Sequence, residues 1–293
     1  MAPAFTVPTI LANNISLSYG TYQDTISISD RNVELDPTGI TLYSQFDLTP
    51  ETSINVNYGE YNDSSRFNNA STIALDTNSW GLGISHSWQA WLFSLDYGYT
   101  EEDISIENNS RDISFYHQTY HAPSWLVSVA YGDFIGNTSR PWYWSVAGNI
   151  QYADWERDIE RVTQPINDPE INTGKDAGDS WFASIGLSLS QFLSTTEDTG
   201  ILYGGSLSWH HLIDGESGVV SRNGRSISQI SRNNSQFNQS NFSQNIDGEQ
   251  YGLATLFVGY NINQQFSVEI DLSTSIAADT NSNSANISTN YQF

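Results

Sequence analysis

The side chains that could do chemistry in this chain are histidines and carboxylates, because the sequence contains no cysteine. The five histidines are His86, His117, His121, His210 and His211. A histidine beside an aspartate or a serine could activate a nucleophile. His117 and His121 are four residues apart, but they lie in a predicted strand or loop, so they lack the helical geometry of the metal motifs with this spacing. We therefore predict interfacial or loop histidines, with no catalytic residue, no enzymatic activity, no metal site and no cofactor.

Carboxylates are the second chemical feature, with 33 acidic against 10 basic residues and a formal net charge of −23. The strand pattern described below directs Asp47, Asp96, Glu269 and Asp271 inward. It assigns the bases to loops, turns or strand ends. An open lumen with this lining favours cations and would conduct acidic sugars or phosphate poorly. A general acidic surface, as in an organism of saline water, is an alternative explanation for the charge. Nucleic-acid binding is not expected at this charge.

The elements that must position these carboxylates are β-strands with strict two-residue alternation. From Trp80 to Trp88, for example, Leu82 and Ile84 alternate with glycine and serine. Successive side chains of a strand point to opposite faces, so one face is apolar and the other is polar. The same alternation occurs in segments 15–20, 40–47, 53–59, 93–99, 125–131, 142–152, 181–190, 203–210, 266–276 and 285–293, and in a more mixed form in 253–261.

The apolar face begins and ends in tryptophan and tyrosine, with aliphatic residues between them. This is typical of a lipid-facing band between two aromatic girdles. The predicted interface aromatics are Trp80, Trp88, Trp125, Trp142, Trp144, Trp181 and Trp209. The other face carries small polar residues that cannot form a close-packed core, which predicts a wet lumen. A soluble β-sandwich is the alternative. The mean hydropathy of −0.41 does not exclude a barrel, because only half of each strand must be apolar.

The spacing of short and long links predicts an all-β fold, a closed antiparallel transmembrane β-barrel of about twelve strands with both ends in the periplasm. Short links fall at 48–51, 89–90, 135–141, 194–199 and 261–264, and long external links at about 21–38, 60–77, 100–115, 155–179 and 214–248. Pro123 interrupts one strand, so ten or fourteen strands remain open. Residues 1–13 are predicted to be a short lumenal or periplasmic leader and 14–293 the barrel. Because the first residues lack a secretory signal, we expect a mature chain whose signal has been removed.

The last strand carries a resemblance to a known class of proteins. Phe293, Tyr291, Thr289, Ile287 and Ala285 alternate with polar residues, and the chain ends on the aromatic. This resembles the C-terminal strand of Gram-negative outer-membrane β-barrels. The resemblance implies that Phe293, Tyr291 and Ile287 belong to a signal for barrel assembly.

Two further patterns resemble autotransporter-type translocator barrels. Segments 36–59 and 79–98 each read as a strand, a tight turn and a second strand that ends in Tyr-Gly. We predict a small passive pore with an acidic, cation-preferring lumen in the outer membrane. One alternative is an autotransporter-like translocator barrel without its passenger, and another is a closed structural or adhesive barrel that acts through external loops. Expected partners are outer-membrane lipid and lipopolysaccharide, the barrel-assembly machinery, and small cations or solutes.

Overall fold

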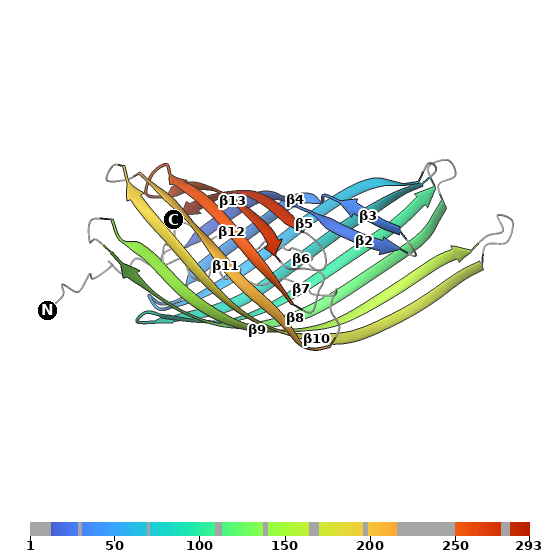
Figure 1. The fold of residues 1–293 in the computed structure, drawn as a ribbon, viewed down its shortest axis with the longest axis horizontal. Helices are drawn as coiled ribbons and strands as arrows, with labels where there is room; N and C mark the ends of the chain where they lie inside the picture. The colour runs from blue at the N-terminus through green and yellow to red at the C-terminus, as the bar shows by residue number, and fades with distance from the viewer. Residues whose placement is uncertain are drawn as a thin grey trace.

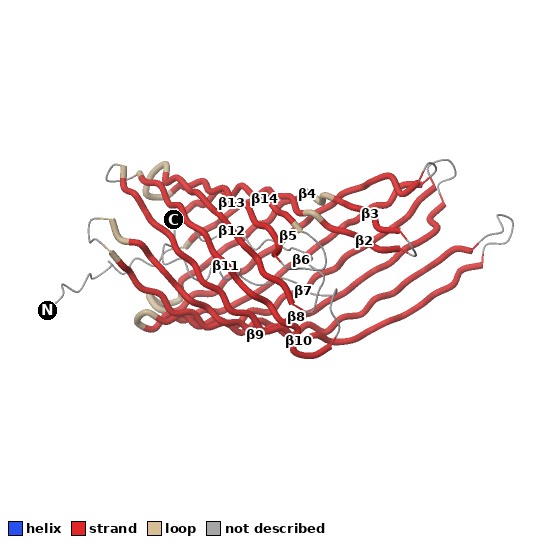
Figure 2. Tube along the Cα trace, in the orientation of Figure 1, coloured by secondary structure: helices blue, strands red, loops and turns tan. Residues whose placement is uncertain are grey.

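A computed structural model describes residues 13–28, 31–68, 71–108, 113–136, 140–163, 170–195, 199–215, 250–276 and 282–293. Its strands are β1 (Asn14–Tyr22), β2 (Asp24–Ile28), β3 (Arg31–Leu35), β4 (Thr38–Asp47), β5 (Thr52–Asn68), β6 (Ser71–Trp88), β7 (Trp91–Asn108), β8 (Ile113–Ile135), β9 (Trp142–Thr163), β10 (Glu170–Ser194), β11 (Gly200–Gly215), β12 (Gln250–Asn261), β13 (Phe266–Ile276) and β14 (Asn283–Gln292) (Figures 1 and 2). Within these described ranges there is no helix with the length and apolarity needed to cross a membrane.

Twelve of these strands form one closed antiparallel barrel, in which every strand pairs with its neighbours. Closure occurs between the first and last strands: β1 pairs with β14, with Ile15 opposite Tyr291 and Tyr19 opposite Ile287. On its other side β1 pairs with β4, so the β2–β3 hairpin is left out of the wall. The predicted fold class is confirmed, and the strand number is the twelve that alternating short and long links required.

The predicted alternation is visible in the burial of each strand. On β6 every odd-numbered residue from Ser71 to Ser85 is buried, whereas Trp80, Leu82 and Ile84 are exposed. A soluble core would bury the aliphatic residues instead. The exposed apolar side chains, which are mainly Leu, Ile, Val, Trp and Tyr, form a belt around the outside of the barrel wall. Such a belt is stable only against lipid.

The predicted long links are shorter than expected, because three of them are largely paired strand. Most of 60–77 lies in the ladder between β5 and β6, most of 100–115 in that between β7 and β8, and most of 155–179 in that between β9 and β10. Figure 1 shows these hairpins extending well past the end of β11–β14. Loops were predicted there because the sequence lacks the aromatic and aliphatic outward face of a lipid-facing strand. The outward face of these external hairpins lies outside lipid, so it can carry charged side chains.

Pro123 lies within β8 and interrupts one of its two ladders. It pairs with Tyr99 of β7, but the register with β9 passes from His121–Glu156 to Ser124–Ala153 without a partner for Pro123. Proline cannot donate a backbone hydrogen bond, so a gap in one ladder is where a strand tolerates it. The interruption is therefore local: β8 continues to Ile135 and β9 begins at Trp142, so the link between them is as short as the sequence predicted.

The β2–β3 hairpin packs against the inner face of the extended hairpins. Its residues Val33 and Leu35 are buried with Ile73, Leu75, Ile104, Ile106 and Tyr116 in one apolar cluster. The hairpin also contacts the barrel through Asp36, whose backbone N–H donates to Asp63 Oδ2 at 2.7 Å. Because β2 and β3 pair only with each other, side-chain packing and not a strand ladder fixes the hairpin against the wall.

The parts of β5–β10 that extend past the barrel form an external sheet, with β5 at one edge and β10 at the other. The β11 ladder with β10 ends where Ser180 meets Gly215, and the β4 ladder with β5 ends where Thr38 meets Asn62. Beyond these pairs, β3 lies against β5, whereas Thr173–Ala177 of β10 are exposed. Among the described residues, the external sheet therefore has one covered edge, at β5, and one edge without a paired strand, at β10.

Several predictions fall outside the described residues. They are the leader up to residue 12, most of the long link that follows β11, and the bases Arg111, Arg222, Arg225 and Arg232. The division into leader and barrel stays a prediction.

Candidate functional site

The four predicted lumenal acids all lie on the inward side of the barrel wall, on three different strands. Asp47 ends β4, Asp96 is in the middle of β7, and Glu269 and Asp271 lie on β13. Asp96, Glu269 and Asp271 are 5%, 0% and 9% exposed, and Asp47 is half-buried. The structure therefore spreads the acids around the lumen. Among the described residues, no three His, Asp or Glu side chains are close enough to hold a metal ion.

Asp96 occupies a site made by a glycine on the next strand. Gly83 of β6 is directly opposite Asp96, and a Cβ added there would overlap the Asp96 carboxylate. The carboxylate accepts hydrogen bonds from Asn55 Nδ2 at 3.3 Å and from Ser94 Oγ at 2.9 Å. Donors from β5 and β7 thus hold this carboxylate in place within the wall.

The β13 acids share one face because they are two residues apart, about 7 Å along the strand. Asp271 accepts a hydrogen bond from Asn286 Nδ2 of β14 at 3.2 Å, and Glu269 lies opposite Ser288. Asp47 accepts a hydrogen bond from Gln45 Nε2 at 3.2 Å. The donors in these two hydrogen bonds, Asn286 and Gln45, are neutral side chains.

The bases of the described region lie away from the membrane-spanning lumen. Arg66 and Lys175 point outward from β5 and β10, and Arg140 is in a periplasmic turn. Arg157 points inward, but it lies in the external sheet and pairs with Asp176. Arg66, Arg157 and Lys175 were predicted in loops, turns or strand ends but lie within strands. These strands continue outside lipid, where charged side chains are tolerated.

The lumen wall is less wet than the sequence predicted. Ser16 and Ser288 are 0% exposed, and nearly all inward residues of β1 and β14 are buried. Inward aromatic residues also contribute: Tyr43 is buried, and Phe257 packs with Leu202 near the periplasmic end. Small polar residues predicted open space, but in the structure most of those on β1 and β14 have little contact with water.

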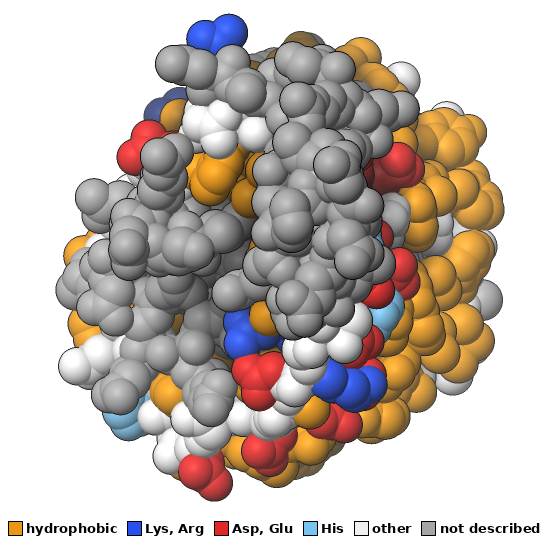
Figure 3. Space-filling view, turned by 90° about the vertical axis from the view of Figure 1, so that its right-hand side faces the viewer, with side chains coloured by type: hydrophobic (Ala, Val, Ile, Leu, Met, Phe, Trp, Pro, Cys, Tyr) orange, Lys and Arg blue, Asp and Glu red, His pale blue; other side chains and the backbone are white. Residues whose placement is uncertain are grey.

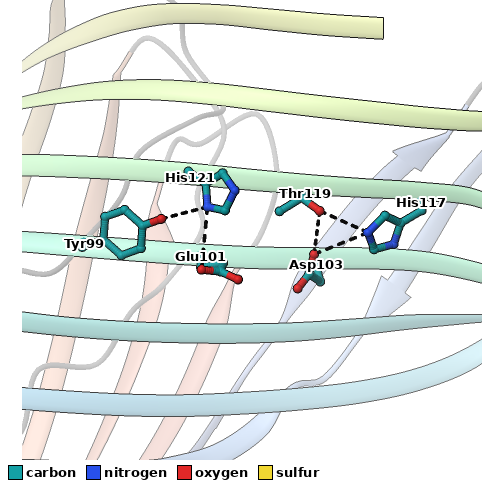
Figure 4. Close-up of polar contacts among 6 residues, drawn as sticks. All are labelled: Tyr99, Glu101, Asp103, His117, Thr119 and His121. Carbon is teal, nitrogen blue, oxygen red and sulfur yellow. Dashed lines mark hydrogen bonds and ion pairs between the residues drawn. The ribbon is translucent and has the colours of Figure 1, made fainter. Parts of the chain in front are cut away.

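A second polar cluster lies on the outward face of β7 and β8, above the outer girdle (Figure 4). His121 Nδ1 is 2.9 Å from Tyr99 Oη and 3.8 Å from Glu101. His117 Nε2 is 3.8 Å from Asp103, and Thr119 Oγ1 is 2.8 Å from Asp103 and 3.1 Å from His117. Figure 3, which views the external end, shows charged side chains along the rim beside the apolar surface.

The Thr119 group does not have the geometry of a catalytic triad. Its hydroxyl donates to Asp103 and so can only accept from His117. In a triad the histidine takes the proton of the hydroxyl and the carboxylate contacts the other ring nitrogen. Here both partners meet the same nitrogen, Nε2. The arrangement cross-links β7 and β8 and has no base for the threonine.

The other histidines lie where the alternation predicted. His86 is exposed on the outward face and its Nδ1 is 2.9 Å from Thr52 Oγ1. His211 is also exposed, whereas His210 points inward, stacks on Tyr251 with 4.6 Å between ring centroids, and lies 3.0 Å from Ser208 Oγ.

Two buried tyrosines outside the membrane belt have altered acidity. Burial raises the pKa of Tyr61 to about 12, although its hydrogen bond with Thr41, 2.7 Å long, acts in the opposite direction. Burial also raises the pKa of Tyr120, and the nearby Glu102 carboxylate adds to this effect. Both phenols therefore stay protonated and neutral at any physiological pH.

The predicted interface aromatics lie on the outward face, in two groups near opposite ends of the barrel. Trp80 packs with Tyr97 and Tyr99 toward the external side, whereas Trp144 packs with Tyr131 near the periplasmic turns. Trp125 contacts Tyr97, Trp181 contacts Tyr152, Trp142 contacts Tyr203, and Trp88 and Trp209 are exposed.

The chain terminus completes the closure of the barrel. The Phe293 backbone N–H donates to Asn13 O at 2.9 Å, and its exposed ring stacks on Tyr291 at 6.1 Å between centroids. Ile287 is exposed on the same face. The three predicted signal residues therefore form one outward stripe at the seam between the first and last strands.

Comparison with solved structures identifies barrels with the same fold. The translocator domain of the autotransporter NalP from Neisseria meningitidis superposes with a TM-score of 0.63 and 10% identity, over 98% of this chain and 90% of that one. The β-domain of the Bordetella autotransporter BrkA gives 0.62 and 8%, over 97% and 100%. The transport unit of AIDA-I from Escherichia coli gives 0.56 and 11%, over 99% and 93%. No protein-family model and no curated protein matches the sequence.

These neighbours are Gram-negative outer-membrane barrels, and the likeness shows the fold alone at this identity. The exposed apolar belt adds an independent observation from this chain's own residues. Together they locate the chain in the outer membrane, as the sequence predicted.

Proposed function

We propose that this barrel is a passive pore for small cations and that the structure described above is its closed state. The observation that carries the proposal is the sign of the inward charge. Asp47, Asp96, Glu269 and Asp271 face the lumen, and no base whose side chain the structure describes faces its membrane-spanning part. Low-dielectric walls focus the field of such charges onto a passing ion. Anionic solutes would meet repulsion without compensating donors.

We assign the first step of opening to the external side. The β2–β3 hairpin packs on the inner face of the external sheet by side chains alone. Its release would break no ladder of the barrel, because its strands pair only with each other. We therefore assign the hairpin the part of a cover that leaves when the pore conducts.

Flux into proteoliposomes tests the proposal. Vesicles that contain the barrel should take up rubidium faster than they release chloride. The double substitution Glu269→Gln with Asp271→Asn should reduce that difference. Glu60→Gln with Asp76→Asn is the matched control, because it removes the same two charges from exposed outward positions of β5 and β6. Uptake equal to that of empty vesicles, with the hairpin removed, would contradict a pore.

A translocator barrel is the second candidate, and the similarity to the NalP translocator domain over 98% of the chain favours it. This function needs a segment that threads the lumen. A reporter peptide fused before residue 1 and found on the cell surface would support translocation over ion passage. Retention of that reporter in the periplasm, with rubidium flux intact, would support the pore.

A further inference from the structure

We propose that the open edge of β10 in the external sheet binds an extended peptide by strand addition, with basic side chains of the peptide over Asp179. The edge is residues 173–179, which lie past the pairing of Ser180 with Gly215, the last described residue of β11. On its other side this segment is fully paired with β9, from Thr173–Glu160 to Asp179–Asp154. Its outer backbone groups are therefore displayed as a template for another strand.

The edge is accessible to an incoming chain. Residues Thr173 to Ala177 are all exposed, whereas the β2–β3 hairpin lies at the opposite edge, where β3 contacts β5. A Cβ added at Gly174 would meet only Ile159, at 4.0 Å. Glycine within a strand commonly marks a place where another backbone approaches closely.

The charges beside the edge select the partner. Asp179 lies directly opposite Asp154, and both are exposed. Like charges in this relation are unfavourable. The nearby bases are engaged elsewhere, since Lys175 pairs with Glu156 and Asp158, and Arg157 pairs with Asp176. A lysine or arginine on an added strand would lie about 5 Å from Asp179 and relieve the repulsion.

A second copy of this chain fits the edge poorly. Copies in one membrane have the same orientation, so their β10 strands run the same way and cannot pair as antiparallel strands. A parallel pair through the same edge of both copies would place the two Asp179 side chains on opposite faces, so neither copy would bring a base to the other's acids. Charge on an edge strand also suppresses indiscriminate pairing. The exposed edge at 173–179 and the repulsion between Asp154 and Asp179 therefore favour a basic extended segment over a neutral or acidic one.

The test uses the full barrel in detergent micelles and a fluorescent peptide, Thr-Lys-Val-Lys-Val-Lys-Thr. Two further versions carry N-methyl groups on alternate residues, so each loses the backbone donors of one edge but keeps its charge. Strand addition predicts that one methylated version binds like the parent and the other binds at least tenfold more weakly. Equal binding of both would show simple ionic attraction and overturn the proposal, as would no binding of the parent.

Protein variants locate the site. Thr173→Pro and Gly174→Pro remove neighbouring N–H groups, which point to opposite sides of β10. One of the two should weaken peptide binding about tenfold, and the other should not. Asp179→Asn should weaken binding severalfold, whereas Asp133→Asn at the periplasmic end of β8 should have no effect. Peptide binding that is lost equally in all four variants would overturn the assignment to β10. A dimer seen by light scattering, and dissociated by one of the two proline substitutions, would also overturn the proposal.

Discussion

Asp96 and Gly83 face each other across the β6–β7 ladder, and the carboxylate fills the space that the glycine leaves free. The wall can hold a buried charge there only because one of the two residues has no side chain. The same relation occurs at Gly39, where a Cβ would overlap the strand and ring of Tyr61. Close approach between inward residues explains how a lumen of small residues becomes a closed wall.

Gly83→Ala should therefore displace the Asp96 carboxylate from Asn55 and destabilise the barrel by about 1–3 kcal/mol. The measurement is the urea midpoint of the purified barrel in micelles. Gly148→Ala is the matched control, because its added Cβ would approach only Ser184 O, at 3.8 Å. An equal midpoint for both variants would show that the Asp96 site is not tightly packed.

Phe293→Asp should impair assembly in cells while leaving the other residues of the seam in place. The ring lies on the lipid face beside Tyr291, and a charge on that face costs up to a few kcal/mol, less near an interface. We expect a larger effect on assembly from the loss of the terminal aromatic residue, because Phe293 belongs to the predicted assembly signal. Heat-modifiable barrel in outer-membrane fractions is the readout. Trp88→Asp places the same charge at another periplasmic strand end, and a yield as low as that of Phe293→Asp would remove any special role for the terminus.

Release of the β2–β3 hairpin should be local. Leu35 is 1% exposed within the apolar cluster, so Leu35→Ala should cost about 2–5 kcal/mol of hairpin docking. Hydrogen exchange should rise in residues 24–35 and stay unchanged in β9–β12. Glu34→Ala, an exposed position on the same strand, is the control. Exchange that rises through the whole barrel would mean that the hairpin is part of the barrel's cooperative unit.

Alkali should destabilise the external mouth through Tyr61. Its folded pKa of about 12 lies above the ordinary value of 10.0, so the folded state binds the proton more tightly. The stabilisation is complete below pH 10 and is lost as the pH rises to about 12. The free energy of unfolding should fall more steeply in this window for the wild type than for Tyr61→Phe. Parallel curves would show that Tyr61 titrates normally.

The sequence predicted the transmembrane part well because lipid imposes a simple rule on each strand. On β6, Trp80, Leu82 and Ile84 must face outward, and the register of the whole strand follows. The external sheet obeys a different rule, since Ile73 and Leu75 are apolar on the inward face. They alternate in the opposite phase, as do Ile104 and Ile106, and this phase change was the available signal.

The candidate sites were less predictable than the fold. The two-residue alternation predicted that Glu269 and Asp271 point inward. It could not predict that Gly83 makes room for Asp96, because these residues face each other only through the register between β6 and β7. The open edge of β10 follows from the unequal described lengths of β10 and β11, which no local sequence pattern encodes. The Asp96 site and the β10 edge therefore both depend on how strands pair, and not on the sequence of one strand.

The measurement that tests the central claim most directly is the reversal potential of single channels in a planar bilayer under a potassium chloride gradient. For the barrel with its hairpin released, we expect a potential close to the potassium equilibrium value. For Glu269→Gln with Asp271→Asn, we expect a shift toward zero. A potential near the chloride equilibrium value would contradict the central claim, and so would a potential that the double substitution leaves unchanged.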